Sequence, residues 1–258
     1  MTTTPTGPDD RSMTVLVVGA TGSVGHHVVD AALERGDRVL ALTRPGSARR
    51  VPAGAEVVEG DIADPASLRL PDVDGVVFTH GSQGGARDAE RIDYGAVANV
   101  LDALGDRPAR VALMTSIGVT GDSYAPHVWK RRGEQLVRAS GRPYTIVRPG
   151  WFDYNDPDQH QLVFLQGDRR QAGIPADGVI ARRQIADVLV ASLHSPAADR
   201  KTLELVAATG PAQTVLDPLF AALKPDPAGA LDGVLDTNLK PLDQEPAAVR
   251  DRLAALRR

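Results

Sequence analysis

Short apolar runs alternate along the chain with longer stretches in which apolar residues recur every three or four positions. The short runs are typical of buried strands, and the longer stretches have the period of an amphipathic helix. The predicted strands are residues 15–18, 38–43, 56–59, 75–79, 110–115, 144–148 and 202–206. The predicted helices are residues 24–35, 89–104, 129–140 and 182–193. This alternation predicts an α/β fold with a mostly parallel, doubly wound sheet, which binds ligands at the carboxyl ends of its strands.

The pattern changes after residue 210, where proline and aspartate become frequent. Only residues 212–224 and 245–257 have a helical pattern in this part of the chain. We expect residues 1–12 to form a disordered tail and residues 13–208 to form the main domain with its pocket. Residues 209–258 are expected to form a small helical extension, packed on that domain or covering its site on the substrate side.

The first predicted strand runs directly into a turn with the glycine spacing G-x-x-G-x-x-G, at Gly19, Gly22 and Gly25, and then into a helix. Glycines let the backbone approach a phosphate closely, and a helix N-terminus presents free N–H groups to it. Glycine alone is a weak signal, because any tight strand–helix turn can require it. The order of strand, glycines and helix nevertheless predicts a Rossmann-like nucleotide-binding site.

The end of the second predicted strand favours NADP(H) over NAD(H). An NAD site usually has Asp or Glu about 20 residues past the glycines, where it binds the ribose hydroxyls. Here Arg44 follows the strand, with Arg49 and Arg50 close behind and no acid beside them. A guanidinium binds a 2′-phosphate, which a carboxylate would repel. The alternative interpretation is a solvated basic loop.

Asp61 and Ile62 follow the third predicted strand and allow two interpretations. Asp61 can accept a hydrogen bond from an adenine amino group while Ile62 packs against the ring. It can equally be a turn or helix-capping aspartate.

The bulk composition excludes several classes of function. The net charge of −4 gives no indication of nucleic-acid or membrane-surface binding. The absence of cysteine excludes thiolate catalysis and cysteine-based metal sites, and no His, Asp or Glu cluster has metal-ligand spacing. The apolar runs are too short to span a membrane, and the first residues do not resemble a signal peptide. We therefore expect a cytoplasmic protein.

Seven segments together resemble the atypical short-chain dehydrogenase/reductases, and within them the NmrA-like NAD(P)H-binding proteins. These segments are residues 19–25, 43–44, 60–61, 93–99, 115–116, 130–134 and 140–150. The similarity covers residues 13–208 and does not extend into the C-terminal part. The glycine turn and the strand that ends at Gly150 are specific for the superfamily, but not for a substrate.

The resemblance implies a role for each of its matching residues along a bound dinucleotide. Its diphosphate would be held by the glycine turn, its 2′-phosphate by Arg44, and its nicotinamide ribose by Lys130. The implied cofactor-binding set is Gly19, Thr21, Gly22, Ser23, Val24, Gly25, Arg44, Asp61, Ile62, Thr79, His80, Gly81, Thr115, Ser116, Lys130, Pro149, Gly150 and Trp151. Within it, residues 79–81 would pass the adenosine ribose, and residues 115–116 and 149–151 would line the nicotinamide pocket.

The superfamily donates a proton from Tyr in a Y-x-x-x-K turn, with Ser polarising the substrate carbonyl. Ser116 and Lys130 match two of these positions, but Pro126 stands where the tyrosine is expected. Tyr124 and His127 are the nearest candidate donors, and both can reach a pocket because Pro126 is typical of a helix start. We assign Ser116, Lys130 and Tyr124 as catalytic. The alternatives are a turn-capping role for Ser116 and a solvated helix face for Lys130.

Aromatic side chains are scarce, yet Trp151, Phe152 and Tyr154 follow the sixth predicted strand closely. With His127 they form the expected substrate-binding set, suited to a flat quinone or aromatic ketone. The alternative is a hydrophobic anchor for a loop. The sequence thus predicts an NADP(H)-dependent oxidoreductase, monomeric or homodimeric, that reduces a carbonyl or quinone group of a small molecule. A non-catalytic NADP(H)-binding redox sensor is the alternative, and a non-redox isomerase or epimerase a third.

Overall fold

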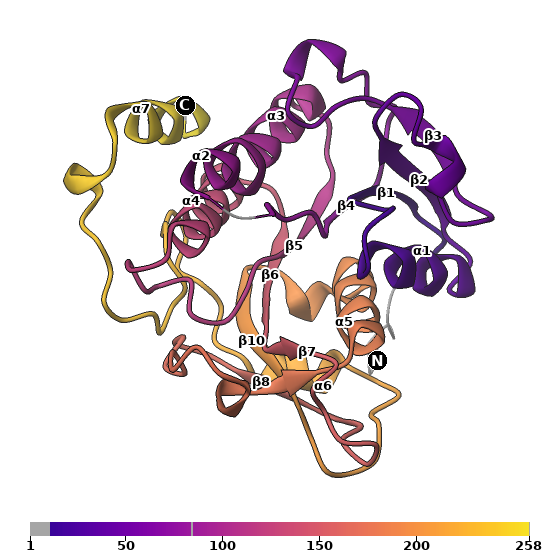
Figure 1. Cartoon of the computed structure of the whole chain (residues 1–258), viewed down its shortest axis with the longest axis vertical. Coiled ribbons are helices and arrows are strands. Elements are labelled where there is room, and N and C mark those ends of the chain that lie inside the picture. Colours follow the sequence, from indigo (N-terminus) through magenta and orange to yellow (C-terminus); the bar gives the residue numbers. More distant parts are fainter. Residues whose placement is uncertain (1–10, 84, 258) are drawn as a thin grey trace, which may run out of the picture.

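An eight-stranded sheet forms the centre of the computed structural model, which describes residues 11–83 and 85–257 (Figure 1). The strand order across the sheet is β3-β2-β1-β4-β5-β6-β10-β8. The strands are β1 (Thr14–Val18), β2 (Arg38–Thr43), β3 (Glu56–Glu59), β4 (Gly75–Phe78), β5 (Arg110–Met114), β6 (Tyr144–Pro149), β8 (Gln161–Leu165) and β10 (Lys201–Ala208). The predicted mostly parallel sheet is confirmed, because only β8 runs antiparallel to its neighbour.

The order in which successive strands are added to the sheet reverses between β1 and β4, at its centre. Val18 at the end of β1 is in register with Leu42 of β2 on one side and with Phe78 of β4 on the other. The first half of the chain winds outward from this point to β3, and the second half winds outward to β10. Such a switch point leaves a crevice at the carboxyl ends of the strands, where open α/β sheets bind ligands.

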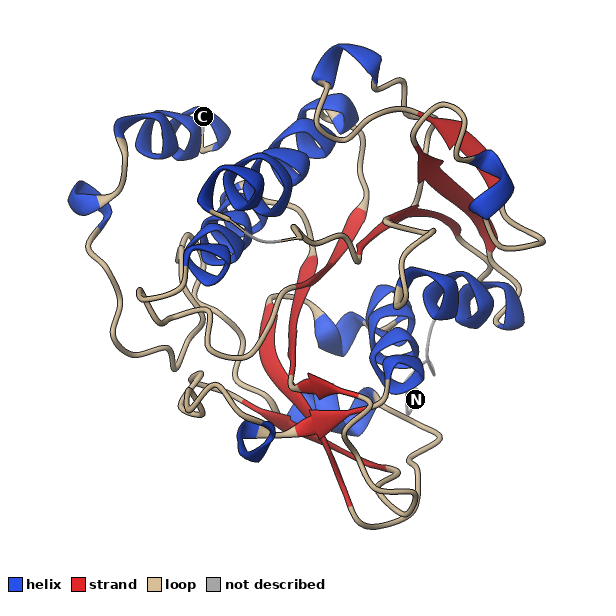
Figure 2. Cartoon of the chain, in the orientation of Figure 1, coloured by secondary structure: helices blue, strands red, loops and turns tan. Residues whose placement is uncertain are grey.

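Helices cover both faces of the sheet (Figure 2). One face packs on α1 (Gly25–Glu34), α5 (Arg182–His194) and α6 (Asp217–Ala222), and the other on α3 (Gly95–Leu104), α4 (Ala125–Ala139) and α7 (Ala247–Leu256). Alternate residues of β1 explain this division, since Val15 and Val17 belong to the first core and Leu16 and Val18 to the second. Burial of both faces requires the continuous apolar runs that the sequence shows.

The helix predicted for residues 89–104 is interrupted. It consists of α2 (Ala86–Ala89), one turn of π-helix (Glu90–Tyr94) and α3. A π-turn inserts an extra residue into the helix, often at a functional site. It also breaks the 3.6-residue period only locally, so the apolar pattern alone did not reveal it.

The helix predicted from Trp129 begins earlier, at Ala125, with Pro126 in its first turn. A proline there lacks only an N–H that the helix would leave unpaired in any case. Two short strands were missed altogether: β7 (Trp151–Phe152) and β9 (Val179–Ile180) pair with each other outside the main sheet. The antiparallel edge strand β8 was missed as well.

Buried ion pairs fix the C-terminal segment, residues 209–257, to the main sheet and to α4. Its acidic residues pair with arginines of α4 and β6: Asp226 with Arg138, Asp232 with Arg131, Asp236 with Arg148, and Glu245 with Arg132. Figure 1 shows this segment in yellow, ending in α7 beside α4. The helix predicted for residues 212–224 is shorter than expected, because Pro218 sets its start and Leu223 is already extended.

Candidate functional site

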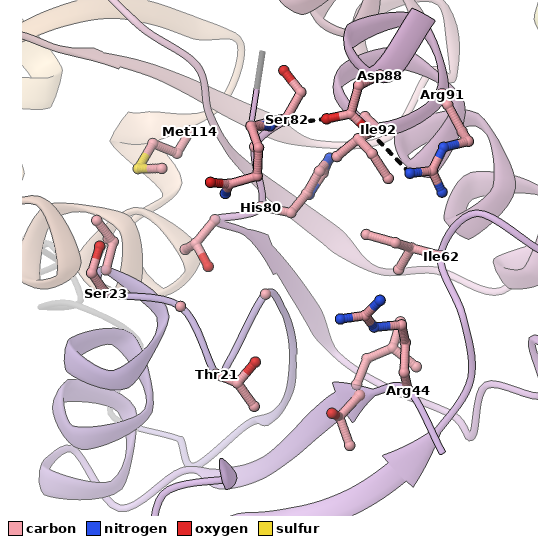
Figure 3. Close-up of a pocket in the computed structure, with 18 of the residues that line it drawn as sticks. Thr21, Ser23, Arg44, Ile62, His80, Ser82, Asp88, Arg91, Ile92 and Met114 are labelled. Atoms are coloured by element: carbon pink, nitrogen blue, oxygen red, sulfur yellow. Dashed lines mark hydrogen bonds and ion pairs between the residues drawn. The ribbon is translucent and has the colours of Figure 1, made fainter. Parts of the chain in front are cut away.

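A cavity of about 680 Å³ opens at the carboxyl ends of β1, β2, β4 and β5. It has the size of a ligand pocket. Figure 3 shows side chains from several elements directed into it, among them Thr21, Arg44, Ile62 and His80. Of the expected cofactor-binding residues, the cavity is lined by Gly19, Thr21, Gly22, Ser23, Val24, Arg44, Asp61, Ile62, Thr79, His80, Gly81, Thr115, Ser116 and Lys130.

The glycines of the turn allow its backbone to pack closely against the neighbouring loop and helix. Gly19 has φ +92°, and a Cβ there would lie 2.8 Å from the backbone nitrogen of His80. Gly25 does not line the cavity: a Cβ at this position would lie 2.1 Å from the Gly19 carbonyl oxygen, so this glycine lets helix and turn pack closely. The turn thus presents backbone N–H groups at the start of α1, which is the arrangement that holds a phosphate.

Arg44 stands at the end of β2, exposed and lining the cavity. Arg50 also lines the cavity, whereas Arg49 does not. Asp88 and Arg91 contribute to the lining as well and form an ion pair of 3.0 Å (Figure 3). These last two were missed, because nothing in the pattern of the α2 region connects it with β1.

Asp61 forms the predicted turn contact, and its contact with an adenine stays a prediction. Its carboxylate accepts a hydrogen bond of 2.9 Å from the Ala63 amide, which is a turn-forming contact. The residue nevertheless lines the cavity, beside Ile62.

Thr115 and Ser116, which follow β5, have different surroundings. The Thr115 hydroxyl donates a hydrogen bond of 2.8 Å to Glu134 of α4. The Ser116 Oγ is buried and has no hydrogen-bond partner among the described residues. Buried hydroxyls without a partner are rare, so this oxygen is available to a ligand.

Lys130 reaches the cavity from α4 and is held by Asp93 of the π-turn. The distance between its Nζ and the Asp93 Oδ1 is 2.5 Å. Asp93 also accepts hydrogen bonds from the amide and the hydroxyl of Ser82, at 3.1 and 2.6 Å. The predicted alternative of a solvated lysine is therefore wrong. Asp93, to which the motifs assigned no role, holds this cavity-lining lysine in place.

His80 is buried beside this pair. Burial lowers the pKa of His80 to about 4, so that the imidazole is neutral near pH 7. Its Nε2 lies 3.1 Å from the Ile92 carbonyl oxygen, which can only accept a hydrogen bond. His80 thereby links the loop after β4 to the π-turn that carries Asp93.

A second cavity, of about 720 Å³, adjoins the first and shares Ser116 and Phe152 with it. The expected residues that line it are Ser116, Tyr124, His127, Pro149, Gly150, Trp151, Phe152 and Tyr154. Pro149, Gly150 and Trp151, expected beside the nicotinamide, thus lie on the side of the second cavity. The two cavities meet at Ser116.

Both candidate proton donors line the second cavity. Tyr124 precedes α4 and is 53% exposed, and its ring stands edge-on to that of His127 at 4.9 Å between centroids. His127 is partly buried against Gly118, and burial lowers the pKa of its imidazole. Pro126, the position of the family tyrosine, is buried.

The aromatic segment after β6 is open to ligands. Trp151 is 37% exposed and Tyr154 63%, with their rings edge-on at 5.9 Å. Phe152 is partly buried beneath the guanidinium of Arg182. The predicted alternative of a buried hydrophobic anchor therefore does not fit Trp151 and Tyr154.

The basic residues near these cavities differ in their partners. Arg182 pairs with Asp153, and Arg183 with Glu34 and Asp187. Arg170 lines the second cavity.

Among residues 11–83 and 85–257, no group of three or more His, Asp or Glu side chains could hold a metal ion. Within the same residues, no helix is long and apolar enough to cross a membrane.

The two cavities fit a dinucleotide and a second molecule. The first cavity is lined by the glycine turn, by Arg44 and by Ser116, whose hydroxyl has no partner among the described residues. Beyond Ser116, the second cavity adjoins this one.

Known proteins with similar sequences include reductases. The sanguinarine reductase of Eschscholzia californica is 26% identical over 246 residues, which cover 76% of this chain and 89% of that protein. A chloroplastic divinyl chlorophyllide a 8-vinyl-reductase of Oryza sativa subsp. indica is 35% identical over 161 residues, which cover 54% of this chain but only 40% of that protein.

Solved structures with the same fold include an oxidoreductase from Lactococcus lactis, with a TM-score of 0.67 and 15% identity, covering 82% of this chain and 99% of that one. A short-chain dehydrogenase/reductase from Veillonella parvula in complex with NADP has a TM-score of 0.58 and 17% identity, with coverage of 76% and 95%. At these identities the similarity shows the fold alone.

The decisive comparison is with a protein family described as NAD(P)H-binding. Its sequence profile matches residues 19–196, from the glycine turn to the end of α5. This match spans more than half of the chain and confirms the resemblance that the motifs indicated. The chain belongs to the NAD(P)H-binding family.

Proposed function

We propose that the protein is an NADP(H)-dependent oxidoreductase that reduces a carbonyl or quinone group of a small molecule with a flat aromatic face. The observation that carries this proposal is the junction of the two cavities at Ser116. A hydroxyl without a protein partner lies where a cofactor in the first cavity would meet a substrate in the second. An enzyme of this class needs a polar donor at that point.

We assign the residues of the first cavity to different parts of the cofactor. Bound NADPH would supply a hydride to the electrophilic carbon of the substrate. The glycine turn holds the diphosphate, and Arg44 holds the 2′-phosphate that distinguishes NADPH from NADH. Lys130, fixed by Asp93, holds the ribose beside the nicotinamide. Preference for NADPH follows from Arg44 and from the lack of an acid beside it.

The residues around Ser116 act on the substrate oxygen. The Ser116 hydroxyl donates a hydrogen bond to the carbonyl oxygen, which gains negative charge as the hydride arrives. A proton then passes to this oxygen from His127 or Tyr124, the two titratable side chains that line the second cavity from the start of α4. Trp151 and Tyr154 offer faces on which a flat substrate can stack.

One feature favours a second function. Pro126 replaces the tyrosine that the superfamily uses as proton donor, and it is buried at the start of α4. A protein that binds NADP(H) and signals the redox state to a partner would not need that tyrosine. We retain this function as the alternative to catalysis.

Titration calorimetry with NADPH and NADH is the first experiment. We expect saturable binding of both, with preference for NADPH. Oxidation of NADPH is then followed by absorbance with a panel of quinones and aromatic aldehydes and ketones. Substrate-dependent oxidation supports the reductase, whereas binding without turnover across the panel favours the sensor. Absence of binding of either nucleotide would contradict both functions.

Location and assembly stay predictions. We propose a cytoplasmic monomer or homodimer, although plant relatives such as the rice reductase are described as chloroplastic. Light scattering of the purified protein measures its oligomeric state.

A further inference from the structure

Arg182, the first residue of α5, connects the two cavities. Its Nε donates a hydrogen bond of 3.0 Å to the hydroxyl of Ser23, which precedes it by 159 residues. Ser23 lines the first cavity and Arg182 lines the second. The guanidinium carbon lies 5.2 Å from the ring centroid of Phe152, which lines both. The positive charge of Arg182 is therefore located at the edge of the glycine turn.

The second partner of this guanidinium is partly exposed to solvent. Arg182 forms an ion pair with Asp153, whose side chain is half exposed. An exposed ion pair contributes little to stability, because water screens both charges. A guanidinium has five N–H donors, and Ser23 and Asp153 do not occupy all of them. Arg182 can exchange Asp153 for another anion at small cost in free energy.

The anion that belongs at the glycine turn is a diphosphate. The turn leads into α1, whose N-terminal N–H groups and helix dipole favour negative charge. Ser23 lies within this turn, so a diphosphate held there comes next to the group that is hydrogen-bonded to Ser23. α1 and α5 also pack against each other, which keeps the start of α5 close to the turn.

We infer that Arg182 is a ligand of the cofactor's diphosphate and that it leaves Asp153 when the cofactor binds. The inference rests on the proposed binding of NADP(H) in the first cavity. Arg182 would bind the diphosphate from its place beside Ser23, at the edge of the glycine turn. Because NADPH and NADH share the diphosphate, Arg182 strengthens the binding of both, whereas Arg44 acts only on NADPH.

The test is titration calorimetry with NADPH and with NADH on Arg182→Gln and on the unaltered protein. We expect the variant to bind both nucleotides roughly 10- to 100-fold more weakly, which is the value of one charge-assisted hydrogen bond. Arg183→Gln is the matched control. It removes the same charge one residue along, from a side chain that pairs with Glu34 and Asp187 and lines neither cavity, so its affinities stay unchanged.

Asp153→Asn separates a ligand role from a structural one. The asparagine can still accept the hydrogen bond that the Arg182 amide donates to Asp153 Oδ1, but it no longer competes for the guanidinium charge. We expect this variant to bind NADPH more tightly than the unaltered protein. If Arg182 serves only to fix Asp153, Asp153→Asn weakens binding as Arg182→Gln does.

The outcomes distinguish failure of the Arg182 role from failure of the proposed function. Unchanged affinities in Arg182→Gln, or weaker binding in Asp153→Asn, overturn the role of Arg182 while the proposed function stands. Failure of the unaltered protein to bind either nucleotide overturns the proposed function itself, and this inference with it.

Discussion

Thr115 and Ser116 are neighbours in the sequence, yet only one of their hydroxyls is free for a ligand. Thr115 is bound by Glu134, and Ser116 has no partner among the described residues. The sequence predicted that both lie in the site, because they follow a buried strand at the ligand-binding edge of the sheet. It could not distinguish them, since Glu134 lies on a helix whose rotation only the packed structure fixes.

Replacement of Ser116 by alanine tests its role in polarising the substrate. We expect kcat to fall by about 10²- to 10³-fold, the usual effect of losing one donor to a developing oxyanion. The Kd for NADPH should stay the same, because the hydroxyl is proposed to bind the substrate. Steady-state kinetics with the best substrate of the panel and calorimetry with NADPH measure the two quantities. An unchanged kcat would remove Ser116 from the mechanism.

Replacement of Arg44 by alanine tests the choice of cofactor. The affinity for NADPH should fall by roughly 10- to 100-fold, because one charge-assisted hydrogen bond to the 2′-phosphate is lost. The affinity for NADH should stay the same. Arg49→Ala, in the same loop but outside the cavity lining, is the control. If the ratio of the two affinities is the same in both variants, Arg44 does not bind the 2′-phosphate.

Helix α4 shows which features of an element a local sequence pattern can predict and which it cannot. Pro126 indicated its start, because proline is favoured in the first turn of a helix, although the apolar pattern placed that start at Trp129. Its run of cations was not, since Lys130, Arg131 and Arg132 look like a solvated face in the sequence. The structure pairs them with Asp93, Asp232 and Glu245. Those acids come from distant parts of the chain, which no local pattern connects with α4.

The pairing of strands β6 and β10 brings one acid into an unfavourable position. Glu204 is opposite Arg148 in the register, yet its Oε1 has no hydrogen-bond partner among the described residues and lies 3.9 Å from the guanidinium. Burial outweighs this attraction and raises the pKa of Glu204 to about 7. In the unfolded chain a glutamate titrates near 4.3. The folded state therefore binds this proton more tightly, and stability decreases as pH rises from about 4.3 to 7.

Glu204→Gln removes this pH dependence. At pH 8 we expect the variant to be more stable than the unaltered protein, by up to about 3 kcal/mol in the free energy of unfolding. At pH 5, where Glu204 is mostly protonated in the folded state, the difference should be much smaller. Urea denaturation at pH 5 and at pH 8 measures this difference in the free energy of unfolding. A difference that is equal at both pH values would contradict the raised pKa.

For the whole molecule, the sequence predicted the parallel sheet and its ligand-binding edge, because buried strands and amphipathic helices have strong periods. It missed β7, β8 and β9, which are short or lie at an edge, where less burial leaves less apolar pattern. It also could not predict that residues 209–257 complete the core. Their acids neutralise arginines that are fully or almost fully buried.

Removal of residues 210–258 should abolish cooperative folding. The shortened chain loses the acids that pair with Arg131 and Arg132, and it loses Asp226 and Asp236, so that Arg138 and Arg148 keep Glu134 but lose a second acid. Each broken buried pair costs about 3–5 kcal/mol. Together these losses are as large as the net stability of about 5–15 kcal/mol that is typical of a protein. Thermal unfolding followed by circular dichroism compares the shortened and the full-length chains. A sharp transition in the shortened chain would show that the segment is peripheral.

The same ion pairs join residues that the ribosome synthesises several seconds apart. Arg138 is 88 residues ahead of Asp226, and Arg132 is 113 residues ahead of Glu245. A ribosome that adds about 5–20 residues per second makes each arginine roughly 5 to 20 seconds before its acid. During that interval Arg138 is paired with Glu134 alone and Arg132 lacks Glu245, so the second core misses part of its charge balance until the C-terminal segment emerges. The protein becomes stable only near the end of its own translation.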